Sequence, residues 1–194
     1  MGDPGTKEQL LSLGDLEATS GLRTGRKHIL SVLVENKPGV LTRVAGLFAR
    51  RGFNIDSLAV GTTEDPRRSR ITIRVSCEQH SIEQVVKQLY KLVDVLKVQE
   101  LDQSAVELEL LMIKVTSSPD RRAEIIALAE VFEARVVDVG PEAVTFSCVS
   151  GPDRLQALEE LMEPYGIREL VRTGRIALDR DGELGKRKRM RVVA

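Results

Sequence analysis

The stretch that decides the fold is ENKPGVLTRVAGLFARRGFNID, residues 35–56. A polar loop ending in Pro38 and Gly39 leads into a segment whose apolar residues recur with the period of a helix. That apolar stripe comprises Val40, Leu41, Val44, Leu47 and Phe48. The helix is expected to stop at Gly52, and strand-like runs lie before the loop and after the stop. The stretch therefore predicts a strand, a helix and a second strand.

The same kind of pattern continues along the chain and then repeats. In the first half we predict strand, helix, strand, strand, helix and strand at 28–35, 40–52, 54–62, 70–76, 81–93 and 96–101. In the second half the same order falls at 106–115, 118–132, 135–139, 143–149, 155–162 and 167–178. Two β-α-β-β-α-β units in tandem predict an α+β protein. Its two ferredoxin-like sandwiches would each have an antiparallel sheet with helices on one face.

The chain of 194 residues is long enough for two small domains. We expect a disordered N-terminal arm at 1–25, a first domain at 26–102, a second ferredoxin-like domain at 106–180 and a basic tail at 181–194. The tail contains the run KRKRMR, which a solvated terminus explains better than a nucleic-acid patch does.

Composition excludes several classes of partner. Lys plus Arg and Asp plus Glu both number 29, so the net charge is zero, which argues against nucleic acid as a partner. No apolar run approaches the length of a membrane span, so no membrane partner is expected. Residues 1–25 lack the apolar core of a signal peptide and contain four acidic residues, so we expect a cytoplasmic protein.

Residues suited to catalysis are scarce. The chain has two histidines and two cysteines, Cys77 and Cys148, and neither cysteine lies in a metal-binding spacing. We interpret both as buried, reduced thiols. No phosphate-binding loop or dinucleotide fingerprint is present, so we expect no enzyme activity, no metal and no cofactor on this chain.

The loop before the first helix is the best candidate for a binding site. The first N–H groups of a helix lack partners and attract anions, and a glycine lets a ligand approach them closely. The N–H groups of Gly39, Val40 and Leu41 would therefore hold a carboxylate, while Asn36 or Asn54 would accept from an ammonium group. Because the two asparagines flank opposite ends of the sheet, a shared site would need a neighbouring subunit or a bent loop.

A purely structural interpretation stays open for the same residues. Asn36 would then form a turn or a helix cap, Gly39 would allow a turn, and Asn54 would tolerate a left-handed backbone. The second unit, however, enters its first helix through Ser117-Ser118-Pro119-Asp120, without a glycine, and lacks the Gly-x-Asn that ends the first helix. Since the same fold is predicted without these residues, the contrast favours a ligand site in the first unit.

Residues 28–73, HILSVLVENKPGVLTRVAGLFARRGFNIDSLAVGTTEDPRRSRITI, resemble the ACT domain of the small regulatory subunits of acetolactate synthase, also called acetohydroxyacid synthase. The segments KQLYKLVDVLKV, RVVDV and GIRELVRTGRIAL resemble the same family. The resemblance covers about residues 26–180, both predicted domains.

The resemblance implies a subunit that performs no catalysis. It would bind a large catalytic subunit that carries thiamine diphosphate, magnesium and FAD and joins pyruvate to pyruvate or to 2-oxobutyrate. The small subunit would activate that partner and confer feedback inhibition by valine in branched-chain amino acid synthesis.

In the family the effector lies between the ACT domains of two chains that pair into one sheet. By motif position, Asn36, Gly39, Val40 and Leu41 of one chain and Asn54 and Ile55 of the other would contact it. We further hypothesise that the valine isopropyl group packs against Val40, Leu41 and Ile55.

Three other functions remain possible from the sequence: a stand-alone ACT-type sensor that controls another enzyme or a transcription factor, a ferredoxin-like RNA binder, and a pure oligomerisation module. RNA binding is disfavoured because the third strand, RITIRVS, has no aromatic residue for base stacking.

Overall fold

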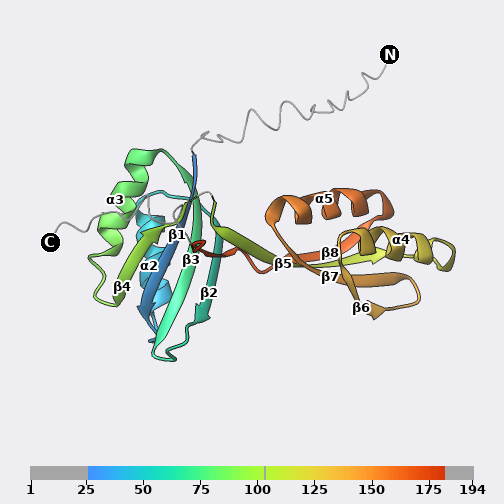
Figure 1. Cartoon of the computed structure of the whole chain (residues 1–194), viewed down its shortest axis with the longest axis horizontal. Helices are drawn as coiled ribbons and strands as arrows, with labels where there is room; N and C mark the ends of the chain where they lie inside the picture. The colour runs from blue at the N-terminus through green and yellow to red at the C-terminus, as the bar shows by residue number, and fades with distance from the viewer. Residues whose placement is uncertain (1–25, 103, 182–194) are drawn as a thin grey trace, which may run out of the picture.

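The computed structural model describes residues 26–102 and 104–181, which form two α+β units side by side (Figure 1). The first unit consists of β1 (Arg26–Glu35), α2 (Val40–Arg50), β2 (Ile55–Thr62), β3 (Arg68–Cys77), α3 (Gln79–Leu89) and β4 (Val95–Glu100). The second consists of β5 (Val106–Thr116), α4 (Pro119–Val131), β6 (Arg135–Val139), β7 (Ala143–Ser150), α5 (Pro152–Met162), the 3₁₀ turn η1 (Glu163–Tyr165), β8 (Ile167–Arg172) and β9 (Ile176–Leu178). The predicted arm at 1–25 and nearly all of the predicted tail lie outside the described residues.

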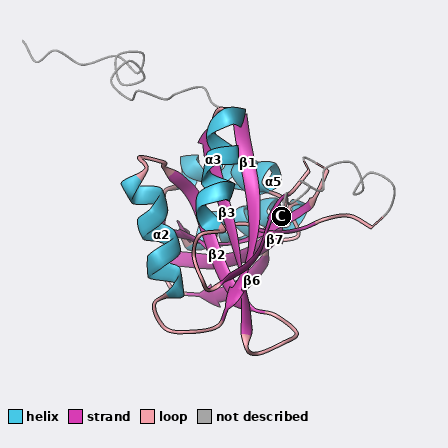
Figure 2. Cartoon of the chain, turned by 90° about the vertical axis from the view of Figure 1, so that its left-hand side faces the viewer, coloured by secondary structure: helices cyan, strands magenta, loops and turns pink. Residues whose placement is uncertain are grey.

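Each unit has an antiparallel sheet with two helices on one face: α2 and α3 in the first unit (Figure 2) and α4 and α5 in the second (Figure 1). The strand orders are β2-β3-β1-β4 and β6-β7-β5-β8. Alternate residues of the central strands face the helices, as the period of two requires. In the first unit Leu30, Val32 and Val34 of β1 are buried with Val44 and Phe48 of α2. The expected α+β class with tandem ferredoxin-like units is confirmed.

The helix predicted at 81–93 ends earlier than expected. Helix α3 stops at Leu89, and the N–H groups of Lys91 and Leu92 bond to carbonyls three residues back, at 3.1 Å each. Val93 lies in the turn that follows and is 93% exposed. Its apolar side chain extended the helical pattern in the sequence, but it belongs to no apolar face of the folded helix.

The final strand, predicted as one element at 167–178, is two strands. Strand β8 pairs with the second half of β5, whereas β9 pairs with the first residues of β5, with Val106 opposite Leu178. The break falls at Gly174, whose φ of 80° is left-handed and costs glycine little. Beyond it the chain turns back towards the first unit, where Ala177 is buried with Ile29 and Leu101.

Candidate functional site

The loop between β1 and α2 has a backbone shaped by its glycine. Gly39 is the N-cap of α2 with a φ of 82°, and no side chain caps the helix. The N–H of Val40 makes a long bond of 3.4 Å to the carbonyl of Lys37. Within the described part of the chain, the N–H groups of Gly39 and Leu41 have no hydrogen-bond acceptor. The helix therefore begins with exposed donors and a partial positive charge.

Asn36 lies beside this helix terminus but is held by another element. Its backbone N–H donates to the carbonyl of Arg67 at 2.8 Å, and its amide nitrogen donates to the carbonyl of Pro66 at 2.9 Å. The helix-cap interpretation of Asn36 is therefore wrong, because both donors secure the turn between β2 and β3. That orientation leaves the amide oxygen as the acceptor of this exposed side chain.

Two cationic side chains flank the loop. Arg43 pairs with Asp94 at 2.6 Å, and its Nη1 lies 3.4 Å from the position that a Cβ at residue 39 would take. Lys37 pairs with Glu35 at 2.5 Å, and its pKa is raised chiefly by that hydrogen bond. Arg43 was missed by the sequence analysis, although its place four residues after Gly39 puts it on the same side of the helix.

The side chains of Val40 and Leu41 differ in exposure. The Val40 side chain is 4% exposed and belongs to the core, so only its backbone faces the loop. Leu41 is 41% exposed and offers its side chain to the surface. A ligand side chain at this loop would therefore meet Leu41 at the surface, while the Val40 side chain packs in the core.

Asn54 and Ile55 lie far from this loop within one chain. Ile55 and His28 both pair with Val75, whereas Glu35 pairs with Arg68 at the other end of the sheet. From His28 to Glu35 an extended strand rises about 23 Å. Asn54 is exposed and Ile55 half-buried. Among the described residues only Glu133 is a non-glycine with positive φ, so the left-handed interpretation of Asn54 is also wrong.

A groove of about 760 Å³ lies elsewhere, on the sheet face that has no helices. It is bounded by the end of β2, by Arg70 and Thr72 of β3, and by the β5–β9 ribbon. None of the predicted site residues lines it. The groove therefore lies between the first sheet and the β5–β9 ribbon and is separate from the β1–α2 loop.

Among the residues that the structure describes, the remaining reactive side chains form no second site. Cys77 and Cys148 are free and buried, and burial raises the pKa of both thiols. Across residues 26–102 and 104–181, no group of three or more His, Cys, Asp or Glu side chains could hold a metal ion. In the same described ranges, no helix is long and apolar enough to cross a membrane.

Both units match known protein families. A family model described as "AHAS small subunit-like ACT domain" matches residues 30–97, and one described as "Small subunit of acetolactate synthase" matches residues 108–181. A probable acetolactate synthase small subunit from Archaeoglobus fulgidus is 51% identical over 154 residues, covering 79% of this chain and 97% of the relative. The chain belongs to the acetolactate synthase small subunit family.

Two further members of the family match this chain over nearly their whole length. The acetolactate synthase small subunit from Mycobacterium bovis is 49% identical over 156 residues, covering 80% of this chain and 93% of its own. The crystal structure of the small subunit from Thermotoga maritima matches with a TM-score of 0.76 and 41% identity, covering 81% of this chain and 99% of that one. The resemblance seen in the sequence is thus confirmed, and a small subunit implies a large one as its partner.

Proposed function

We propose that this small subunit activates the catalytic subunit of acetolactate synthase and makes it sensitive to valine, which binds where two copies of the chain meet. The thiamine diphosphate, magnesium and FAD of the reaction would be carried by the catalytic subunit. The small subunit would act only by binding, as a regulatory subunit of branched-chain amino acid synthesis. Family membership favours acetolactate synthase over any other enzyme as the regulated partner.

One observation carries the proposal: β2 is an edge strand that runs parallel to β1. Val34 of β1 and Thr62 of β2 both pair with Ser69, so the end of β2 is level with the β1–α2 loop. A second copy that pairs antiparallel with this edge would bring the start of its own β2 to that end. Asn54 and Ile55 of the second copy would then face Asn36 and Gly39 of the first.

The chemistry of the loop suits an α-amino acid. The N–H groups of Gly39 and Leu41 would donate to the carboxylate, with Arg43 and Lys37 adding positive charge nearby. The amide oxygens of Asn36 and of Asn54 from the second copy would accept from the ammonium group. An isopropyl side chain would pack between Leu41 and Ile55, and burying it would contribute about 1.5–3 kcal/mol.

A ligand that bridges two copies changes how they pack. An allosteric effector must bind one arrangement of the two copies more tightly than another. A coupling free energy of about 1–3 kcal/mol between the valine site and the catalytic subunit is enough for feedback control. A pure oligomerisation module, by contrast, would bind no amino acid at saturable sites.

The test uses a cognate acetolactate synthase catalytic subunit. Its activity is measured alone, with this small subunit, and with increasing valine, while calorimetry of the small subunit follows valine, leucine and isoleucine. We expect activation, then inhibition by valine, and saturable heat for at least one of the three amino acids. No activation, or activation with no amino acid bound, would contradict the proposal.

A further inference from the structure

The loop that joins β8 to β9 reaches across the molecule and contacts β2. The backbone N–H of Arg175 donates a hydrogen bond of 3.0 Å to the hydroxyl of Ser57, although 118 positions separate the two residues. Ser57 lies near the start of β2, two residues after Ile55. Ile55 belongs to the proposed effector site. The contact therefore joins the start of β2 to the C-terminal unit.

The absence of a side chain at Gly174 lets the β8–β9 loop approach β2 closely. A Cβ at this position would lie 3.0 Å from the carbonyl oxygen of Leu58 and 3.3 Å from the hydroxyl of Ser57. The φ of 80° also disfavours any other residue. Residue 174 is thus packed tightly against the backbone of Leu58 and the hydroxyl of Ser57, with no room for a side chain of its own.

Between Ile55 and Ser57 the pairing with β3 is irregular. Ile55 is opposite Val75 and Ser57 is opposite Arg74, so Asp56 is an extra residue on β2. Such a bulge bends its strand and leaves the extra residue out of the ladder. Asp56 accepts a hydrogen bond from the Ser76 hydroxyl at 2.6 Å, and Arg74 lies 4.0 Å away. This is the segment of β2 least constrained by strand pairing.

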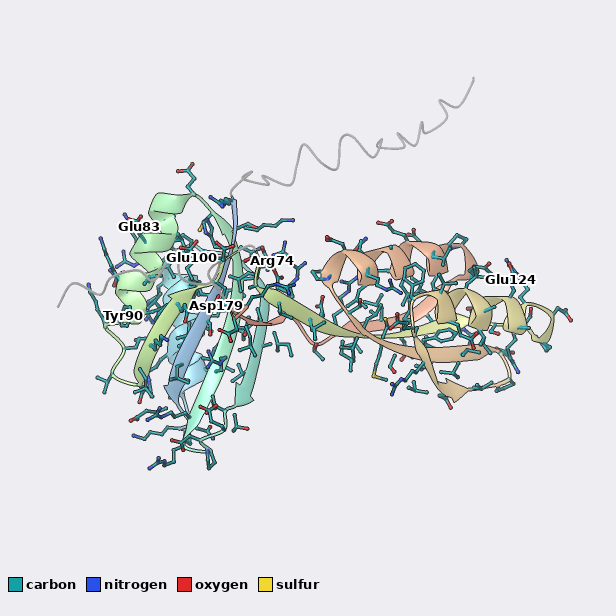
Figure 3. The ribbon with its side chains drawn as sticks, in the orientation of Figure 1. Arg74, Glu83, Tyr90, Glu100, Glu124 and Asp179 are labelled. Atoms are coloured by element: carbon teal, nitrogen blue, oxygen red, sulfur yellow. The ribbon has the colours of Figure 1, made fainter. Side chains whose placement is uncertain are left out.

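On the other side of the contact the chain is anchored to the second unit. Arg175 pairs with Glu107 of β5 at 3.3 Å, and both side chains are largely buried. Arg74 also lies at this junction, where the first unit meets β5 (Figure 3). Burial and the neighbouring Arg175 lower the pKa of Arg74. Strand β9 then pairs with β5, which connects this segment to the strand that begins the second unit.

We propose that Ser57 and Gly174 form a joint that transmits occupation of the effector site to the C-terminal unit. The inference rests on the proposed function, because it requires an amino acid bound near Ile55. The joint is a continuous path of short contacts that leads from Ile55 through the bulge at Asp56 to Ser57, Gly174 and β5. The joint acts on the response to the ligand and does not itself hold the ligand.

The first test uses the small subunit alone. Hydrogen exchange of the amides of residues 174–178 is measured with and without saturating valine, in the native chain, in Ser57→Ala and in Gly174→Ala. We expect valine to change the exchange in the native chain and in the controls Ser147→Ala and Gly166→Ala, but not in Ser57→Ala or Gly174→Ala. Gly166 is a suitable control because its φ is 90° but a Cβ there meets Thr116 only at 3.5 Å. An unchanged exchange in valine-bound native protein overturns the joint.

The second test uses the complex with the catalytic subunit. In Ser57→Ala and Gly174→Ala we expect activity at saturating valine to return towards the uninhibited level, while the valine affinity from calorimetry stays within about threefold. Full inhibition in both variants overturns the joint, and so does loss of valine binding in both, since the residues would then belong to the ligand site. A native chain that binds no valine refutes the proposed function itself, and that result is distinct from either of these.

Discussion

The hydroxyl of Tyr90 donates a hydrogen bond to the carbonyl of Val98 at 3.0 Å and accepts one from the N–H of the same residue at 3.2 Å. Tyr90 directly follows α3, and Val98 lies in β4, one of the two edge strands of the first sheet (Figure 3). The pair of bonds satisfies backbone groups that the edge would otherwise offer to another strand. Tyr90 therefore occupies backbone groups at the β4 edge, and the proposed pairing of two copies would use the opposite edge, β2.

Removing the Tyr90 hydroxyl is expected to weaken the first unit. Tyr90→Phe loses two hydrogen bonds, and we expect the free energy of unfolding to fall by about 1–2 kcal/mol. Urea denaturation measures the change. Tyr165→Phe is the matched control, because its hydroxyl donates to the exposed carboxylate of Glu124 at the surface and its loss should change stability little. Equal losses in the two variants would contradict the role assigned to Tyr90.

Charge on the β2 edge is expected to disrupt pairing of two copies. Val60 is an apolar β2 residue that is 47% exposed. Val60→Glu would place like charges close together across a two-fold β2–β2 interface and would leave them partly desolvated. We expect sedimentation to show weaker self-association. Val93→Glu serves as the control, since Val93 is fully exposed in the turn before β4; a dimer unaffected by Val60→Glu would argue for another interface.

A negative charge at residue 39 is expected to weaken valine inhibition. Gly39→Asp places a carboxylate where the ligand's own would lie, and we expect the inhibitory valine concentration to rise about tenfold or more, equivalent to ~1.4 kcal/mol. Gly39→Asn has nearly the same size and the same left-handed backbone without the charge, so its smaller effect separates repulsion from strain. Activation of the catalytic subunit should persist in both. Identical inhibition curves for the native chain and Gly39→Asp would count against the site.

Asn54 provides a milder test of the same site from the second copy. Its side chain is exposed and is distant from the β1–α2 loop of its own chain, so Asn54→Ala should leave the melting temperature unchanged while raising the valine dissociation constant. Asn36→Ala is expected to affect both, because it also releases the carbonyl of Pro66. Calorimetry and thermal melting separate the two outcomes. A normal valine affinity in Asn54→Ala would remove this residue from the site.

The two thiols are expected to react slowly in the folded protein. Burial raises the pKa of Cys77 and Cys148, so the thiolate fraction at pH 8 is smaller than for a free cysteine, and access is limited as well. Labelling with a thiol reagent should therefore be slow in native buffer and rapid for both residues in denaturant. Fast labelling of either thiol in the native state would contradict the buried, reduced interpretation.

The elements that local pattern determines were predicted correctly from the sequence. The helix predicted at 40–52, which ends at Arg50, and the alternation in β1 and β3 depend on residues close in the chain, and their apolar periods indicate which face is buried. The repeat of the same order made the two-unit architecture visible without tertiary information. The loop at Gly39 was found for the same reason, because a helix start and its missing Cβ are local features.

Only the tertiary structure determined the contacts between residues that lie far apart in the sequence. The tie of Asn36 to Pro66, the burial of Val40, the return of β9 to the first unit and the contact of Arg175 with Ser57 each join segments that no local pattern relates. Apolar periodicity reports that a residue is buried but not against what, and a polar side chain accepts whichever partner the fold brings near. The sequence by itself therefore determined the elements and the candidate loop, whereas packing between segments distant in the sequence decided how that loop is held within the first unit and how the second unit contacts β2.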